Sequence, residues 1–451
     1  MATALADLAG LVRIPSVAWP AFDPSQVQAS AQAVAALAER TGVFDTVVIR
    51  RAEAAEGELG QPAVLATRAA RDGRPTILLY AHHDVQPPGD DAQWESPPFQ
   101  PTLRSGRLYG RGAADDKAGI MVHLAALRAV HEALGGDLSW GITLFVEGEE
   151  EYGSRSFAAF LAEHREALRS DVIVVADSGN GDEQTPALTV SLRGSVRFTV
   201  SVRTLDHASH SGMYGGAVPD AMLALIRLLD SLWSDDGSVA VAGLTSHLGP
   251  VPAYGEDELR AETGLLPGVA PIGDGPVLGR IWHRPAITVT GMDAPALAAA
   301  SNTLASRAAA VVSVRIAPDQ PASEAFEAIT AHLHAHAPFG AEVSITEADC
   351  ADGFLVDTAG AAVTAALAGM RDGYGVEPVL TGVGGSIPFV AELVRAFPTA
   401  QILITGVEDP GSRAHSPNES LHLDTFRNAV FAEALLLESL HRDGLRTGPA
   451  A

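Results

Sequence analysis

An acidic run follows an apolar segment about a third of the way along the chain. FVEGEEEYGS, residues 145–154, places four carboxylates within five positions: Glu147, Glu149, Glu150 and Glu151. They cannot all stay ionised without positive charge nearby, and the surrounding sequence supplies few cations. A solvated helix N-terminus also favours acids. We interpret the run as part of a metal site, in which one glutamate binds a cation and its neighbour takes a proton from water.

Two other segments carry acids and imidazoles at useful spacings. In YAHHDVQP, residues 80–87, His82 and Asp84 lie two apart and share one face of a strand, and a carboxylate beside an imidazole fixes its tautomer. The alternative is a plain pair of polar residues at a strand end. In GRGAADDKAG, residues 110–119, Asp115 and Asp116 open a helix. For these two aspartates the alternative is helix capping.

The set is completed by Asp177 in VVADSGN and His415 in SRAHSPNES. Two histidines with three or four carboxylates and no thiolate suit a pair of zinc ions, or cobalt or manganese, that share a bridging carboxylate. Paired metals polarise a carbonyl and make hydroxide available near neutral pH. The chemistry that we expect is hydrolysis of an amide.

The elements that must position these residues alternate between helix and strand. Strands are predicted at 76–84, 141–148 and 171–177, with helices between them. Apolar strands that alternate with helices indicate a mostly parallel sheet covered on both faces. Such sheets bind ligands at the carboxyl ends of their strands, and His82, Glu150 and Asp177 lie at or just past such ends.

A different pattern begins near residue 188. The order β-α-β-β-α-β is typical of a four-stranded α+β domain of the split βαβ, ferredoxin-like type. The helix–strand alternation returns after residue 351. We therefore predict an α/β catalytic domain made of residues 1–187 and 352–451, interrupted by an inserted α+β domain at 188–351.

Composition limits the partners and the compartment. A net charge of −25 argues against nucleic acid or an anionic membrane as partner. No apolar stretch approaches the roughly 20 residues of a membrane span, and the first residues lack the pattern of a signal peptide, so a cytoplasmic protein is expected. The single cysteine, Cys350, excludes an internal disulfide and is expected to be buried.

Seven motifs in order carry a family resemblance: HxDVQP, GRGxxDDK, EGxEExGS, ADS, HSGxYGG, GGSIP and AHSxNE. On these the sequence resembles the M20 family of metallopeptidases over essentially its whole length. HHDVQPP, SHSGMYGG and RAHSPNES are most similar to the carnosinase-type dipeptidases. The resemblance implies a dizinc exopeptidase catalytic domain with an inserted lid and dimerisation domain, a homodimer, and hydrolysis of dipeptides that have a free C-terminal carboxylate.

The resemblance also implies roles around the metals. His82 and Asp177 hold one ion, Glu151 and His415 hold the other, and Asp115 bridges both. Glu150 is the general base that activates a hydroxide bridging the two zinc ions, and Asp84 orients His82. The Asp115–Asp116 peptide is expected to be cis.

On the substrate side, the resemblance implies that His210 reaches across the dimer to stabilise the oxyanion and that Arg315 binds the terminal carboxylate. Asn302 is expected near the substrate carbonyl, and Gly385 and Ser386 near the carboxylate end. Two departures from the family pattern, at 382–383 and 302–305, touch only this side. Deacylation of N-acyl amino acids by the same metal centre is therefore the alternative reaction. A non-catalytic binding protein would have lost ligands or the base, and here all are present.

Overall fold

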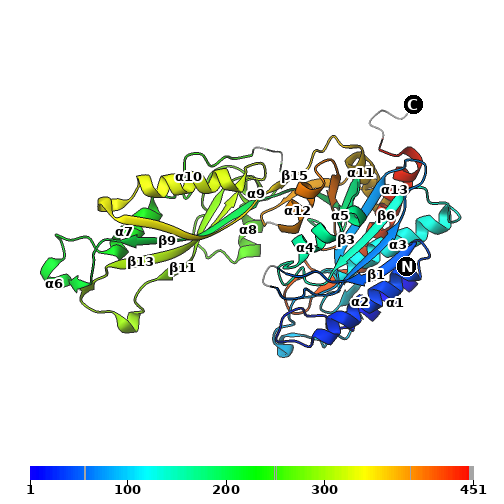
Figure 1. The fold of residues 1–451 in the computed structure, drawn as a ribbon, viewed down its shortest axis with the longest axis horizontal. Helices are drawn as coiled ribbons and strands as arrows, with labels where there is room; N and C mark the ends of the chain where they lie inside the picture. Colours follow the sequence, from blue (N-terminus) through cyan, green and yellow to red (C-terminus); the bar gives the residue numbers. More distant parts are fainter. Residues whose placement is uncertain (55–56, 248, 250, 386–387, 446–451) are drawn as a thin grey trace. The chain divides into compact units, whose positions relative to one another are not determined.

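The chain folds into two compact units. The computed structural model describes residues 1–54, 57–247, 249, 251–385 and 388–445. Unit 1 consists of Met1–Val190, Val356–Leu380 and Glu392–Ala451, and unit 2 of Ser191–Leu355 and Thr381–Ala391 (Figure 1). The chain changes from one unit to the other after Val190, Leu355, Leu380 and Ala391.

Unit 1 is built on a sheet with a parallel centre. Its strands follow the order β1-β2-β6-β3-β7-β17-β8, with bounds β1 (Thr46–Arg50), β2 (Ala63–Arg68), β6 (Gly141–Glu147), β3 (Thr76–His82), β7 (Val172–Val175), β17 (Gln401–Ile404) and β8 (Ala187–Leu192). β3 runs parallel to β6 and β7, and β17 runs parallel to β7. β1, β2 and β8 pair antiparallel toward the edges. The prediction of a mostly parallel sheet is confirmed.

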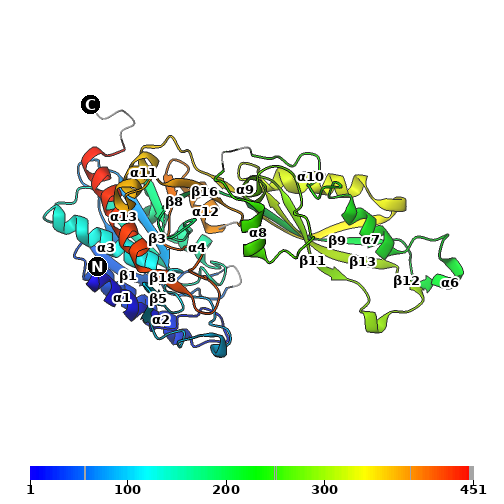
Figure 2. The same ribbon diagram turned by 180° about the vertical axis from the view of Figure 1, so that it is seen from behind.

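Helices cover both faces of this sheet (Figure 2). On one face α3 (Lys117–Ala133) packs against β3, α1 (Ala2–Val12) and α13 (Leu423–Asp443), and α11 (Ala361–Tyr374) packs on α13. α2 (Pro24–Glu39) packs against β1 and β2. On the other face Tyr80 and Phe145 meet edge to face, and Phe145 stacks on Phe160 of α4 (Phe157–Glu163). Between the strands predicted at 141–148 and 171–177, where a helix is expected, the structure has two helices, α4 and α5 (Arg165–Leu168), which His164 separates.

A small three-stranded sheet brings two distant segments together. Its order is β18-β5-β4, with bounds β18 (Ser420–His422), β5 (Arg107–Tyr109) and β4 (Thr102–Arg104). Leu421 pairs with Leu108 in this sheet. The loop before β18 carries His415, and the loop after β5 carries Asp115, so this pairing sets where both side chains lie.

Unit 2 is a four-stranded antiparallel sheet with helices on one face. The order is β11-β13-β9-β14, with bounds β11 (Ala286–Asp293), β13 (Arg307–Ile316), β9 (Gly194–Arg203) and β14 (Glu342–Ala351). Alternate side chains, such as Val196, Phe198 and Val312, form a core with α7 (Ala221–Asp230) and α10 (Ala322–Ala335). The predicted split βαβ arrangement is confirmed.

Shorter elements complete the description of unit 2. β10 (Ser209–His210) pairs with β12 (Thr303–Leu304) in a two-stranded sheet. α8 (Glu256–Thr263) and α9 (Val277–Trp282) lie between α7 and β11. β16 (Val379–Val383), which pairs with β8 and enters unit 2 at Thr381, leads into the glycine turn at 384–385. Among the described residues, no helix is long and apolar enough to cross a membrane.

The expectation that Cys350 is buried is wrong, because its side chain is exposed. It lies on β14, which forms one edge of the sheet in unit 2. The pairing of β14 with β9 shifts register between Thr346 and Asp349, and the residues that follow this irregularity are exposed. Edge position and register are tertiary properties that local composition does not report.

Candidate metal centre

The carboxyl ends of three neighbouring strands carry the predicted ligands. β3 ends at His82, which pairs with Glu147 at the end of β6. Glu150 and Glu151 follow β6, and Asp177 follows β7 after two residues. Because β3, β6 and β7 are parallel, their carboxyl ends meet at one edge of the sheet. That edge collects four of the predicted side chains.

Two groups of side chains in unit 1 could each hold a metal ion. One consists of His82, Glu150 and Asp177, the other of Asp115, Glu151 and His415, and in each group the ligand atoms lie within 4.8 Å of one another. The five predicted ligands and the predicted base are therefore all brought together. The grouping differs in one respect from the implied roles, because Glu150 lies among the possible ligands of the first group.

Asp115 faces both groups. Its Oδ1 lies 3.1 Å from His82 Nε2, and its Oδ2 lies 3.0 Å from His415 Nε2. His415 Nε2 is also 3.1 Å from Glu151 Oε2. The two oxygens of one carboxylate thus point to one imidazole each, which suits a ligand shared between two ions. The Asp115–Asp116 peptide is cis, as the resemblance implies.

Asp84 supports both the imidazole and the acidic run. Its carboxylate accepts hydrogen bonds from the backbone N–H groups of Glu150 and Glu151, each at 3.1 Å, and lies 3.4 Å from His82 Nδ1. A proton on Nδ1 leaves Nε2 free to face a metal. Asp84 therefore sets the direction of His82 and the position of the 150–151 backbone together.

Two glutamates of the acidic run belong to the candidate metal centre, and the other two make hydrogen bonds that support the fold. Glu149 accepts hydrogen bonds from the backbone N–H and the hydroxyl of Ser156. Glu147 accepts one from the hydroxyl of Tyr80 at 2.7 Å, and burial raises the pKa of Glu147 to about 8. Only Glu150 and Glu151 belong to the groups that could bind metal. The crowding of charge is thus partly relieved by structural hydrogen bonds.

The centre has more acid than local cations can compensate. Burial raises the pKa of Glu150, and the charge of Asp177 adds to the rise. Burial likewise raises the pKa of Asp177 to about 6, despite the opposing charge of His82. Hydrogen bonds to Asp115 and Glu151 raise the pKa of His415 to about 11. These raised pKa values favour protons on the side chains of the centre, and divalent ions would displace those protons.

The donor set fits divalent cations of the zinc type. Imidazole nitrogens and carboxylate oxygens without thiolates suit zinc, cobalt and manganese. The burial of His82, Asp84 and Asp115 also fits, because a dry, supported site holds its ligands in fixed directions.

Sequence reasoning assigned no role to Glu419. This carboxylate is 0% exposed and accepts four hydrogen bonds. The donors are Arg111 Nη1 at 2.6 Å and the backbone N–H groups of Gly112, Ala114 and Asp115 at 2.9, 2.9 and 3.1 Å. Glu419 therefore ties the loop of Asp115 to the loop of His415. The glutamate of the AHSxNE motif was visible in the sequence, but its partners were not.

Replacing Glu419 by glutamine is expected to lower metal affinity by about 10–100-fold, the range typical of mutations at residues that hydrogen-bond to a metal ligand. It should also cost about 3–5 kcal/mol of stability, because Arg111 stays buried without its charge partner. Competition with a chromophoric chelator measures the first effect and urea unfolding the second.

The matched control is Asp409→Asn, which removes the carboxylate of another buried pair, with Arg107. It should lose stability but keep metal affinity. Equal affinity losses in both variants would show that Glu419 acts only through general stability.

Two other residues near the centre were also missed. Gln86 Nε2 donates to Glu151 Oε2 at 2.7 Å, and its backbone N–H lies 3.2 Å from Glu151 Oε1. Burial raises the pKa of Glu408, and the charge of Asp115 adds to the rise. Gln86 belongs to the HxDVQP motif, which was a usable signal; Glu408 had none.

The predicted substrate-side residues lie in unit 2. His210 pairs with Thr303 across β10 and β12, and the N–H of Ser211 donates to the carbonyl of Asn302 at 3.0 Å, so His210 and Asn302 come from adjacent segments. His210 is exposed. Gly385 follows β16 in a half-buried turn, while Ser386 lies outside the described residues.

Arg315 lies near one end of β13, and the segment with Asn302 lies beyond the other end, at Arg307. Eight residues of extended strand at 3.3 Å each separate Arg307 from Arg315 by roughly 26 Å. The structure therefore does not bring Arg315 together with His210 or Asn302 within one copy of unit 2.

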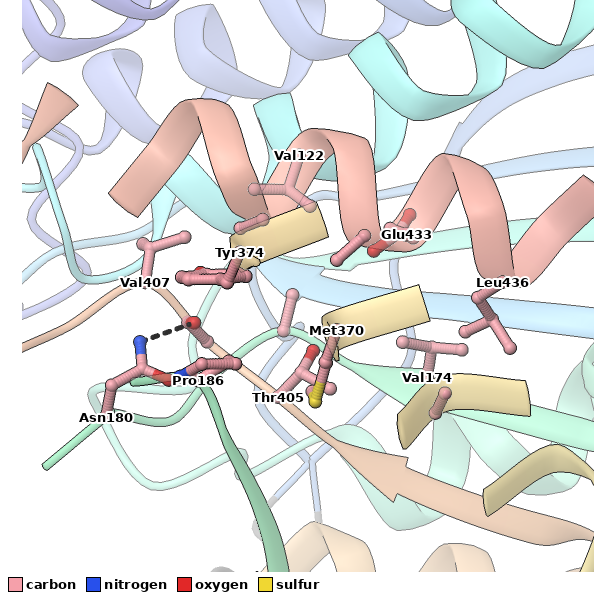
Figure 3. Close-up of a pocket in the computed structure, with 15 residues that line it drawn as sticks. Val122, Val174, Asn180, Pro186, Met370, Tyr374, Thr405, Val407, Glu433 and Leu436 are labelled. Atoms are coloured by element: carbon pink, nitrogen blue, oxygen red, sulfur yellow. Dashed lines mark hydrogen bonds between the residues drawn. The ribbon is translucent and has the colours of Figure 1, made fainter. Parts of the chain in front are cut away.

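Unit 1 also contains a cavity of about 40 Å³ (Figure 3). It lies between β7, β17, α11 and α13, and its wall includes Glu433, Thr405, Tyr374 and Asn180. Glu433 pairs with His123, whose Nε2 lies 2.9 Å from the carbonyl of Tyr80. A space of this size holds two or three waters, so it is not a place for a peptide.

Comparison with known proteins supports the resemblance. The profile described as "Peptidase family M20/M25/M40" matches residues 78–439. The cysteinylglycine-S-conjugate dipeptidase of Corynebacterium striatum is 36% identical over 368 residues, 80% of each chain. The mouse Beta-Ala-His dipeptidase is 28% identical over 379 residues, 80% of this chain and 76% of that one.

Solved structures show the same fold. Human carnosine dipeptidase 1 has a TM-score of 0.71 at 22% identity, covering 98% of this chain and 96% of that chain. The family profile spans most of the sequence, and a relative above 30% identity covers four fifths of it. The chain therefore belongs to peptidase family M20/M25/M40 and is a peptide-bond hydrolase.

Proposed function

We propose that this protein is a dipeptidase that cleaves dipeptides with a free C-terminal carboxylate at a centre of two divalent metal ions. The observation that carries the proposal is the placement of Asp115, whose two carboxylate oxygens face His82 and His415 separately. The names of the bacterial and mouse relatives, both dipeptidases, support the substrate class.

In this proposal each residue of the centre has one task. His82 and Asp177 would hold one ion, Glu151 and His415 would hold the other, and Asp115 would be shared between them; zinc fits the donor set. When bound, the ions polarise the scissile carbonyl and make a water acidic near neutral pH.

Glu150 accepts the proton of the attacking water and passes it to the leaving amine. A carboxyl group whose pKa burial raises above its usual range suits both steps. Asp84 keeps the proton of His82 on Nδ1, so that Nε2 stays directed at the metal.

The substrate side requires residues of unit 2. Arg315, with Gly385 and Ser386, binds the terminal carboxylate, Asn302 lies near the carbonyl, and His210 donates to the oxyanion.

A homodimer is supported by the length of β13. Within one copy, His210 and Asn302 lie beyond the Arg307 end of β13, and Arg307 is separated from Arg315 by roughly 26 Å of strand. An extended dipeptide spans only about 7 Å. One substrate cannot reach both ends of β13, so we propose that His210 and Asn302 of the partner subunit complete the site.

A substrate panel tests the proposed reaction. With zinc, cobalt or manganese present, kcat/KM for dipeptides should exceed that for matched N-acetyl and N-succinyl amino acids by at least about 10-fold, since 1.4 kcal/mol of differential binding suffices. Liberated amino groups are measured by a ninhydrin or fluorogenic assay. Preference for the acylated compounds would favour the deacylase instead, and identical rates with the metals chelated would count against the metal centre.

A further inference from the structure

Arg193 is a buried guanidinium that has no acidic partner among the residues that the structure describes. It immediately precedes β9 and is only 8% exposed. Its Nε donates to the carbonyl of Gly384 at 2.9 Å and its Nη1 to the carbonyl of Arg284 at 3.2 Å. Burial and the charge of Arg315 lower the pKa of Arg193 to about 10, and no carboxylate of the described residues offsets them. Arginine stays charged in proteins, and a buried charge is normally paired.

Arg193 lies beside Arg315 at one end of the sheet in unit 2. Ser195 of β9 pairs with Arg315 of β13, so these two side chains share one face of the sheet. Arg193 immediately precedes β9, two residues before Ser195, and is close enough for the charge of Arg315 to act on its guanidinium. The face that carries Ser195 and Arg315 is opposite α7 and α10, because the alternate residues Val196 and Val314 belong to the core with those helices.

The neighbouring arginine shows the usual arrangement. Arg284 lies two residues before Ala286, which pairs with Arg315 from the other side. Its Nη1 lies 2.6 Å from Asp274 Oδ1. Of these two flanking arginines, the more exposed one has a carboxylate partner, and the buried one has none within the described part of the chain.

The chain around Arg193 leaves no room for a larger residue at Gly384. A Cβ there would lie 3.2 Å from Arg193 Nη2 and 2.9 Å from Ile281 Cγ2. Gly384 thus lets the turn approach the guanidinium between α9 and the sheet. Nη2 makes no hydrogen bond to any described residue and is the donor left for a ligand.

We propose that Arg193 and Arg315 form a two-guanidinium anion site whose ligand is the terminal carboxylate of the substrate. This inference rests on the proposed function, which assigns the carboxylate to Arg315 alone. Guanidinium groups match carboxylates in geometry and charge. An uncharged ligand would leave the charge of Arg193 buried and uncompensated, so the site selects against C-terminal amides.

The test compares Arg193→Gln with the matched control Arg284→Gln on a dipeptide and its C-terminal amide. Arg193→Gln is expected to raise KM for the dipeptide about 100-fold, the size typical of a lost buried charge partner. Its kcat should change little, and the dipeptide should lose most of its advantage over the amide. Arg284→Gln should keep that advantage. Equal losses for both substrates in Arg193→Gln would overturn the proposal.

A second variant separates binding from the hydrogen bonds to Gly384 and Arg284. Arg193→Lys keeps a charge and should recover part of the preference for the carboxylate. If the site held a free inorganic anion instead, adding chloride or sulfate would change wild-type rates on both substrates alike, and the assignment to the substrate carboxylate would fail.

Calorimetric titration with acetate keeps this inference distinct from the proposed function. If wild-type protein hydrolyses no dipeptide, the proposed function fails, yet acetate binding that Arg193→Gln abolishes and Arg284→Gln retains would still support the anion site. Equal acetate binding by all three proteins would refute it, whatever the activity.

Discussion

Replacing Glu150 by glutamine should lower kcat on a dipeptide by about 10³-fold and leave two metal ions per chain. The amide has the size of the acid but cannot accept a proton, and a positioned general base contributes about 10²–10⁴-fold. The loss should appear in kcat more than in KM, because the proton moves only in the reaction. Steady-state kinetics and elemental analysis of the same preparation measure both parts.

The number of metal ions that Glu150→Gln binds decides whether Glu150 is a general base or a metal ligand. Because this residue lies within ligand distance of His82 and Asp177, loss of one ion per chain in Glu150→Gln would assign it as a ligand. Glu163→Gln, on an exposed position of α4, controls for the general effect of removing a carboxylate. Unchanged turnover by Glu150→Gln would remove it from the mechanism.

Strand ends explain why part of the centre was predictable. His82, Glu150 and Asp177 follow apolar runs whose parallel pairing could be inferred from the alternation with helices. Their meeting at one edge then follows from the topology alone.

Asp115 and His415 are brought together by a different route. They depend on the pairing of β5 with β18, two strands of three residues each that have no visible periodicity. Their residue types made both candidates for the metal set, but only the family resemblance assigned each of them a place in the centre.

Burial in unit 2 was the least predictable property. Alternate side chains of β9 and β13, such as Val196 and Val312, face the helices and form the core. Outside this core, exposure depends on distant segments. Arg193 is covered near Gly384 and Ile281, whereas Cys350 on the edge strand is uncovered. Composition favours the opposite result for both residues.

Removing the metals is expected to abolish hydrolysis and to lower the melting temperature of unit 1. Without cations, the negative charge of the centre is reduced by protons on His82 and His415, whose pKa values their acidic partners raise, and by the raised pKa of Glu150. A ligand that binds only the folded chain stabilises it by about 2.7 kcal/mol when present at 100 times its Kd. Scanning calorimetry before and after dialysis against a chelator, and again after adding zinc, cobalt or manganese, measures this shift.

The affinity of the centre for metal ions is expected to depend on pH, because metal ions and protons compete for the same side chains. Since ions displace protons from His82 and His415, binding releases protons and affinity should rise with pH.

Asp115→Asn is the informative variant, because it weakens a ligand that faces both imidazoles. Its melting temperature should already be low and should respond little to added zinc. The control compares the wild-type protein before and after its metals are chelated. If both forms have the same melting temperature and hydrolyse dipeptides at the same rate, these acids and imidazoles do not come together to bind cations.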